Sequence, residues 1–250
     1  MGARIVNDDF SDTYLYNAVG VNGFPNDEFS ITWRVKVAVD RADYMTYMCV
    51  ASTTFGGGNE YWTAADFNSP NVPHIGSDGS DTLLSTQGSP SPGVWKRMAF
   101  QRLSTGGANR EQRWWPDLDK GQSLFVQRND ADDIVYEAAA RFCIGNVPYT
   151  TNEGVDGTFA DVKVWSIPKT IADLDQESTS GQIVLPNGGT SLWAQYPLVS
   201  DGNDISGNAR HLTSEVSGGS ITFDGIAGPG FAVIPVMNKS KFPRIRLRVG

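Results

Sequence analysis

The amino-acid sequence predicts an all-β protein, built as a two-layer sandwich or barrel of short strands. The chain has 27 glycines and 13 prolines among its 250 residues, and only 19% of its residues are charged. This composition is typical of many short strands joined by tight turns, and it disfavours helices rich in Glu and Lys. Stretches with a period of two recur along the chain, separated by clusters of Gly, Asn, Asp and Pro. Such a repetition of strand and turn indicates a sandwich or barrel.

The clearest predicted strand covers residues 29–39. Its sequence FSITWRVKVAV places Phe29, Ile31, Trp33 and the following alternate residues on one face, with mostly polar residues on the other. Nine further strands are predicted at residues 43–52, 93–103, 123–128, 132–138, 141–145, 159–165, 191–198, 220–224 and 230–236. Only residues 167–177 look helical, so we expect one short helix.

Two long irregular stretches interrupt the predicted strands. Residues 53–91 are dense in Gly, Ser, Asn and Asp, and residues 104–122 carry Arg113 and the adjacent pair Trp114 and Trp115. Loops of this length inside a compact domain are often functional. We therefore expect any binding site to lie there.

Length and charge narrow the possible partners. A chain of 250 residues can form one large all-β domain or two small ones. Its net charge of -8 opposes attraction to nucleic acid or to an anionic membrane. The sequence has no apolar run of about 18 residues that would insert in a membrane. The N-terminal sequence MGARIVNDDF lacks the apolar core of a signal peptide, so we expect synthesis in the cytoplasm without one.

The two cysteines, Cys49 and Cys143, lie in apolar, strand-like surroundings. We expect buried, reduced thiols, because unoxidised cysteine behaves as a small core residue and no secretory context is visible. A disulfide between them is the alternative.

Residues 157–165, GTFADVKVW, followed by Ser-Ile-Pro and a short apolar stretch at Ile171 and Leu174, resemble a known family. They are similar to the closing strand and short helix of concanavalin A-like, laminin-G-type β-sandwiches. The segments FSITWRVKV, VWKRMAFQRL, SLFVQR, RFCIGN and SLWAQYPLVSDGNDISGNARHLT also follow that family's order. The resemblance implies a two-sheet antiparallel jelly-roll sandwich at residues 1–236 with adjacent first and last strands. It also implies a concave face, and rim loops that in many members bind calcium or sugar.

Catalysis is not expected from the sequence. Glycosidases of this fold often carry Glu-x-Asp-x-x-Glu, which places an acid and a nucleophile close together, and no glutamate here has that spacing. The chain has only two histidines, His74 and His211, and it has neither a Gly-x-Ser-x-Gly elbow nor a phosphate-binding loop. We expect a non-enzymatic protein, with a polysaccharide-degrading glycosidase as an alternative.

Three acidic clusters carry oxygens that could bind calcium: Asp78 and Asp81; Asp130, Asp132 and Asp133; and Asp201, Asn203 and Asp204. The cluster that the family resemblance favours is formed by Asp201, Asn203 and Asp204, whose oxygens are of the type that calcium prefers. Asx turns that cap hairpins explain the same residues equally well.

Loop aromatics are the candidate ligand-binding residues, because sugar rings stack on such side chains while nearby polar groups bind the hydroxyls. Trp114 and Trp115 cannot both face the core if that segment is extended. One of them is therefore either exposed to a ligand or packed against a covering loop, and we favour packing. The predicted site residues are Tyr61, Trp62, Arg113, Trp114, Trp115 and Tyr149.

Residues 237–250 form a basic tail that differs from the rest of the chain. It has five basic residues and no acidic ones, and its arginines alternate with Ile245, Leu247 and Val249. This pattern suits an edge strand that docks on a partner, with a strand of the same sandwich as the alternative. The predicted docking residues are Lys239, Lys241, Arg244, Arg246 and Arg248.

Together these features predict a non-catalytic, lectin-like module that recognises a glycan or a protein surface. A sandwich of this type with no leader but with a docking tail suggests a component of a virus or phage particle, such as a fibre, decoration or tail adhesin. Such a component would lie on the virion or another extracellular surface, as an oligomer or as part of an assembly. A purely structural assembly protein is the alternative.

Overall fold

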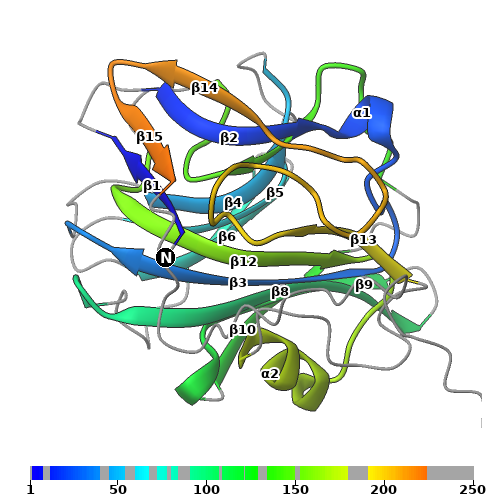
Figure 1. Cartoon of the computed structure of the whole chain (residues 1–250). Helices are drawn as coiled ribbons and strands as arrows, with labels where there is room; N and C mark the ends of the chain where they lie inside the picture. The colour runs from blue at the N-terminus through cyan, green and yellow to red at the C-terminus, as the bar shows by residue number, and fades with distance from the viewer. Residues whose placement is uncertain are drawn as a thin grey trace, which may run out of the picture.

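The computed structural model of the chain is a sandwich of two antiparallel sheets (Figure 1). It describes residues 2–7, 12–39, 45–53, 60–67, 72–77, 80–83, 91–106, 109–120, 122–128, 134–149, 153–179 and 191–223. The predicted all-β, two-sheet jelly-roll class is therefore confirmed.

Sheet A has eight strands among the described residues. In spatial order they are β10 (Gln122–Arg128), β9 (Asn109–Asp117), β8 (Trp95–Gly106), β3 (Phe29–Val37), β12 (Gly157–Trp165), β1 (Ala3–Val6) and β15 (Ser220–Phe223), and β13 (Leu192–Tyr196) also pairs with β12. The predicted strand at residues 29–39 is thus the centre of this sheet, paired to β8 and β12.

Sheet B has seven described strands. Their order is β14 (Thr213–Ser217), β2 (Asp12–Ala18), β11 (Arg141–Ile144), β4 (Met45–Ala51), β5 (Glu60–Phe67), β6 (Val72–Ser77) and β7 (Ser80–Leu83). β14 pairs with β2 in sheet B, whereas β15, the next strand along the chain, pairs with β1 in sheet A. The first and last described strands are therefore neighbours, as the family resemblance implied (Figure 1).

The core lies between the two sheets and is rich in aromatic side chains. Phe29 and Trp33 of β3 are fully buried, and the ring of Trp62 from β5 stacks on Phe100 of β8 with centroids 4.6 Å apart. Burying one such side chain contributes about 1.5–3 kcal/mol, so this layer holds the sheets together.

Three short helical segments accompany the sheets: α1 (Val19–Asn22), a 3-10 turn η1 (Leu118–Lys120) and α2 (Ile171–Thr179). α2 begins after Thr170, whose hydroxyl accepts a hydrogen bond from the Asp173 amide, while the Asp173 carboxylate accepts one from the Thr170 amide. α2 packs on the outer side of sheet A at β3 and β8 (Figure 1). No helix among the described residues is long and apolar enough to cross a membrane.

Several predicted boundaries were wrong. Residues 53–91 contain β5, β6 and β7, and residues 104–122 contain β9, so neither stretch is the long irregular loop that we expected. Residues 134–137 of the predicted strand 132–138 form no ladder. Sequence analysis missed β1, β2 and β14. The predicted strand at 230–236 lies outside the described residues.

Candidate functional site

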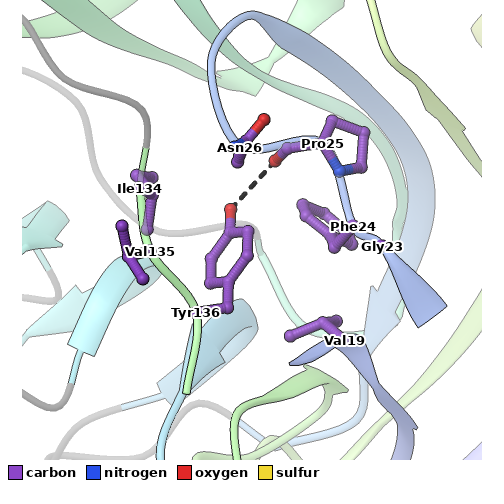
Figure 2. A pocket seen from close by; sticks show the side chains of 8 residues that line it. All are labelled: Val19, Gly23, Phe24, Pro25, Asn26, Ile134, Val135 and Tyr136. Carbon is purple, nitrogen blue, oxygen red and sulfur yellow. Dashed lines mark hydrogen bonds between the residues drawn. The ribbon is translucent and has the colours of Figure 1, made fainter. Parts of the chain in front are cut away.

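A pocket of about 420 Å³ lies where two connecting segments meet (Figure 2). One segment links β2 to β3 and the other precedes β11. The pocket is lined by Val19, Gly23, Phe24, Pro25 and Asn26 from the first segment, and by Ile134, Val135 and Tyr136 from the second. We call it the rim pocket.

The first wall of the rim pocket is fixed by the end of α1. Gly23 has a φ of +62°, in the left-handed region where glycine carries no Cβ penalty, and the Phe24 amide donates a hydrogen bond to the Val19 carbonyl at 3.4 Å. Phe24 then turns into the core, where its ring lies 4.9 Å from Trp193 and 5.3 Å from Phe142 between centroids. This anchor holds Pro25 in a buried position and leaves Asn26 exposed at the surface of the turn.

The second wall is tied to the first by two hydrogen bonds. The Ile134 amide donates to the Asn26 carbonyl at 2.8 Å, and the Tyr136 hydroxyl donates to the Pro25 carbonyl at 2.9 Å (Figure 2). Burial raises the pKa of Tyr136 above its usual range, so the hydroxyl stays protonated and able to donate. Between these anchors Val135 is 86% exposed, which leaves an apolar side chain facing solvent at the mouth of the pocket.

A smaller depression of about 190 Å³ shares Pro25 and Asn26 with the rim pocket and adds Asp27, Glu28 and Ser166. Asp27 is 41% exposed at its side chain and pairs with Arg110, whose Nε lies 2.6 Å from Oδ1. A carboxylate oxygen of Glu28 accepts a hydrogen bond from the Ser104 amide at 2.6 Å. The joined surface therefore has an apolar half and an acidic half with hydrogen-bond acceptors.

Such a surface suits a ligand with one apolar face and several hydroxyl groups. The apolar half offers aliphatic and aromatic contacts, whereas the carboxylates and the serine hydroxyl accept hydrogen bonds. Among the described residues, no group of three or more His, Cys, Asp or Glu is placed to hold a metal ion.

Two of the predicted site residues lie directly behind the rim pocket. The Tyr61 ring packs edge-on against Tyr136 at 5.0 Å between centroids, and its hydroxyl accepts a hydrogen bond from the Glu137 amide at 3.1 Å. Trp62 is fully buried, and its ring lies 6.3 Å from that of Phe24. Both residues belong to β5 rather than to a loop, so Trp62 supports the pocket and offers no face to a ligand.

Neither Trp114 nor Trp115 is exposed, which agrees with packing and leaves no face of either indole for a ligand. The two indoles do face opposite sides of β9, but Trp114 is fully buried in the core, and Trp115 is covered on the outer side by Leu118 and Leu174. Arg113 stacks over the Trp115 ring at 5.7 Å and pairs with Glu111. None of these three residues lines the rim pocket.

Tyr149 is partly buried in a different cluster. It packs against Tyr14, Cys49, Cys143 and neighbouring apolar residues on the outer face of sheet B. Tyr149 does not line the rim pocket, so its predicted role in ligand binding does not belong to that site.

The predicted calcium cluster holds the backbone of its own loop. The Asp201 carboxylate accepts hydrogen bonds from the amide and side chain of Asn203, an Asx turn. Asp204 is buried and accepts hydrogen bonds from the amides of Gln195, Ser206 and Arg210 and from the Ser206 hydroxyl. These contacts favour the structural alternative to calcium binding.

The basic tail, with Lys239, Lys241, Arg244, Arg246 and Arg248, lies outside the described residues.

Sequence analysis missed the residues that shape the rim pocket. Gly23-Phe-Pro-Asn-Asp27 carries a turn signal that marks an exposed connection, and it could have been examined as a candidate loop. Tyr136 was assigned to a strand. No sequence signal shows that these segments meet, because about a hundred residues separate them.

Comparison with known proteins yields neither a matching family model nor a matching curated protein. Solved structures do match. Tailspike protein 2 of an Escherichia coli O157:H7 bacteriophage is 12% identical, with a TM-score of 0.51 over 79% of this chain and 26% of that one. A SAP-like pentraxin from Limulus polyphemus is 12% identical, with a TM-score of 0.51 over 88% of this chain and 94% of that one. A candidate carbohydrate-binding protein from Bacteroides ovatus is 13% identical, with a TM-score of 0.54 over 89% and 60%.

These similarities show the fold. The chain spans about a quarter of the tailspike protein and somewhat over half of the Bacteroides protein. All three neighbours are consistent with the two-sheet sandwich described above.

Proposed function

We propose that this chain is a non-catalytic recognition module that binds a glycan through the rim pocket. One observation carries the proposal: Val135 stands 86% exposed beside a partly buried tyrosine, in a pocket that continues into an acceptor-rich depression. Apolar side chains in a concave site beside a small number of polar groups are the combination by which small-ligand pockets bind. A pyranose ring matches both halves of this surface.

One fold neighbour, the candidate carbohydrate-binding protein from Bacteroides ovatus, supports the same class of ligand. Another neighbour, the phage tailspike protein, supports a place on a phage particle. We extend the proposal to a place on a virus or phage particle, or on another extracellular surface, where the sandwich faces outward and the basic tail at residues 237–250 docks on neighbouring subunits. Membership of the concanavalin A-like, laminin-G-type group belongs to the same proposal.

A glycan array with wild-type protein and two matched variants tests the pocket. Val135→Glu places a charge at the mouth of the rim pocket, whereas Val216→Glu makes the same change on β14, where the valine is 52% exposed. We expect Val135→Glu to weaken binding of any hit by about tenfold or more, because an apolar contact is replaced by a charge that must be desolvated. Val216→Glu should bind as the wild type does.

Three outcomes would count against the proposal. Absence of binding by the wild type to any glycan would remove the carbohydrate ligand. Equal losses in both variants would place the site elsewhere. Release of new reducing ends from a bound polysaccharide would show that the protein is a glycosidase rather than a non-catalytic module.

A further inference from the structure

Cys49 and Cys143 lie directly opposite each other on two neighbouring strands. Cys49 belongs to β4 and Cys143 to β11, and the register of this antiparallel pair makes them Cα partners. β4 and β11 are inner strands of sheet B, with β2 on one side and β5 on the other. Ninety-three residues separate the two cysteines along the chain, so the fold alone brings them together.

Both thiols point to the same face of the sheet. Residues opposite each other in an antiparallel pair share a face, and Cys49 and Cys143 belong to one cluster on the outer side of sheet B. The adjacent Val50 and Phe142 face the core between the sheets instead. Both cysteines are reduced, and both are fully buried.

The backbone geometry of the pair is compatible with a disulfide. The Gly145 amide donates to the Tyr47 carbonyl at 3.0 Å, so residues 145 and 47 form a hydrogen-bonded pair, and the alternation of two places Cys143 and Cys49 in the same class. Cα atoms of such pairs are about 5.5 Å apart, within the range of about 4.4–6.8 Å that disulfides span. The Cβ atoms of a hydrogen-bonded pair are also about 5.5 Å apart, whereas a disulfide needs about 3.5–4.5 Å. Closing the bond therefore requires a local shift of both strands, and it leaves a strained bond that is more easily reduced.

We infer that Cys49 and Cys143 are an oxidation site, at which a reversible cross-strand disulfide staples β4 to β11. The oxidant is a small-molecule disulfide such as glutathione disulfide. The thiolate of one cysteine attacks a sulfur of the oxidant and releases one reduced thiol, and the second cysteine then displaces the other. Two protein thiols and one oxidant disulfide thus give one protein disulfide and two reduced small thiols.

The cover over the thiols controls when the reaction occurs. Val147 and Tyr149 pack on the cluster, and the Cys49 thiol donates to the Asn146 carbonyl at 3.7 Å. A buried thiol reacts slowly, because the thiolate is disfavoured and the oxidant lacks access. The bond therefore forms most readily during folding, before this cover is in place, and the cover afterwards slows its exchange with small thiols without preventing reduction.

Refolding the full chain with and without glutathione disulfide tests this inference. After alkylation, a non-reducing proteolytic digest should contain one peptide pair that joins Cys49 to Cys143, and both thiols should be lost together. The oxidised protein should melt about 5–15 °C above the reduced protein, and dithiothreitol should abolish that rise. The folded reduced protein should react much more slowly than the refolding chain.

Cys49→Ala and Cys143→Ala are the matched controls. Each single variant should show no rise in melting temperature on oxidation, because it has no second thiol to complete the bond. If a variant fails to fold, the peptide map of the wild type still decides. Two alkylatable thiols after oxidative refolding, a disulfide between two chains, or an unchanged melting temperature would each overturn the inference.

Discussion

Trp114 and Trp115 are consecutive residues of β9, yet both indoles are buried, on opposite faces of sheet A. Trp114 faces sheet B, with its ring 6.0 Å from that of Tyr47. Trp115 faces outward and is covered by Leu118 of η1 and Leu174 of α2. α2 and η1 therefore form a partial third layer, and the two tryptophans report on two different interfaces.

Alanine substitutions of these two tryptophans should have different effects, because each side chain belongs to a different interface. Trp114→Ala should lower the free energy of unfolding by about 3–5 kcal/mol, because it leaves a cavity in the core. Trp115→Ala should cost less overall but should loosen α2, whose amides then lose protection in hydrogen exchange. Urea titrations and exchange at residues 171–179 measure the two effects. Equal protection of α2 in both variants would contradict a distinct outer layer.

The stability of the protein should fall as the pH rises through neutrality, because of Asp161. This residue lies at a bulge in β12 with a φ of +53°, and its carboxylate is fully buried beside Lys163, with Nζ 3.6 Å from Oδ2. Burial, together with the nearby charge of Glu177, raises the pKa of Asp161 to about 7. The charges of Lys163 and Arg34 lower this pKa but do not outweigh burial. The folded state thus binds a proton more tightly than the unfolded chain. The resulting stability is fully present below about pH 4 and is lost as the pH rises through about 7.

Asp161→Asn removes this pH dependence and should be more stable than wild type above neutral pH, with the difference reversed or gone near pH 4. Asparagine also tolerates the left-handed backbone. Asp161→Ala is the control. Its free energy of unfolding should vary with pH as that of Asp161→Asn does, but it should be about 1–2 kcal/mol lower at every pH, because alanine is strained in the left-handed conformation. Thermal melts between pH 4 and 8 measure both. A parallel profile for wild type and Asp161→Asn would refute the raised pKa.

Asp204 should contribute to stability without calcium. Asp204→Ala leaves three amides without their acceptor and should cost about 3 kcal/mol, whereas the exposed Asp201→Ala should cost about 1 kcal/mol or less. Calcium should leave the melting temperature of the wild type unchanged. A calcium-dependent rise that Asp201→Ala abolishes would show instead that the loop binds the ion.

The basic tail stays a prediction of assembly. Removal of residues 239–250 takes away Lys239, Lys241, Arg244, Arg246 and Arg248, and it should reduce the size of the purified species in light scattering. Reversing the three arginine charges to Glu should have the same effect, since an acidic surface would then repel the tail. An unchanged mass for both forms would favour a tail that folds back as a strand of its own sandwich.

A strand can be predicted from the sequence when its two faces differ in polarity. β3 alternates cleanly because one face meets the core, and the other carries Arg34 and Lys36 at the surface side. β9 was missed because both of its faces are buried: polar residues such as Glu111 and Gln112 are enclosed together with the two tryptophans, so no period of two remains. β5 and β6 were hidden by the glycine-rich and asparagine-rich segments around them.

The candidate site was much less predictable than the fold. Tyr61 was identified, but as a loop residue rather than a support for Tyr136. Aromatic residues are as useful in a core as on a surface, so residue type alone did not separate Trp62 from an exposed aromatic. The rim pocket depends on two hydrogen bonds between distant segments, and these are a property of the tertiary structure.

The pairing of β1 with β15 has a mechanical consequence. Ala3, at the start of β1, lies opposite Phe223, at the end of β15. Tension applied to these two positions in opposite directions loads the same end of the ladder, so its hydrogen bonds rupture one after another rather than sharing the load. Stretched in this way, the sandwich should peel open at β15 under a small force, while the central strands of both sheets stay intact.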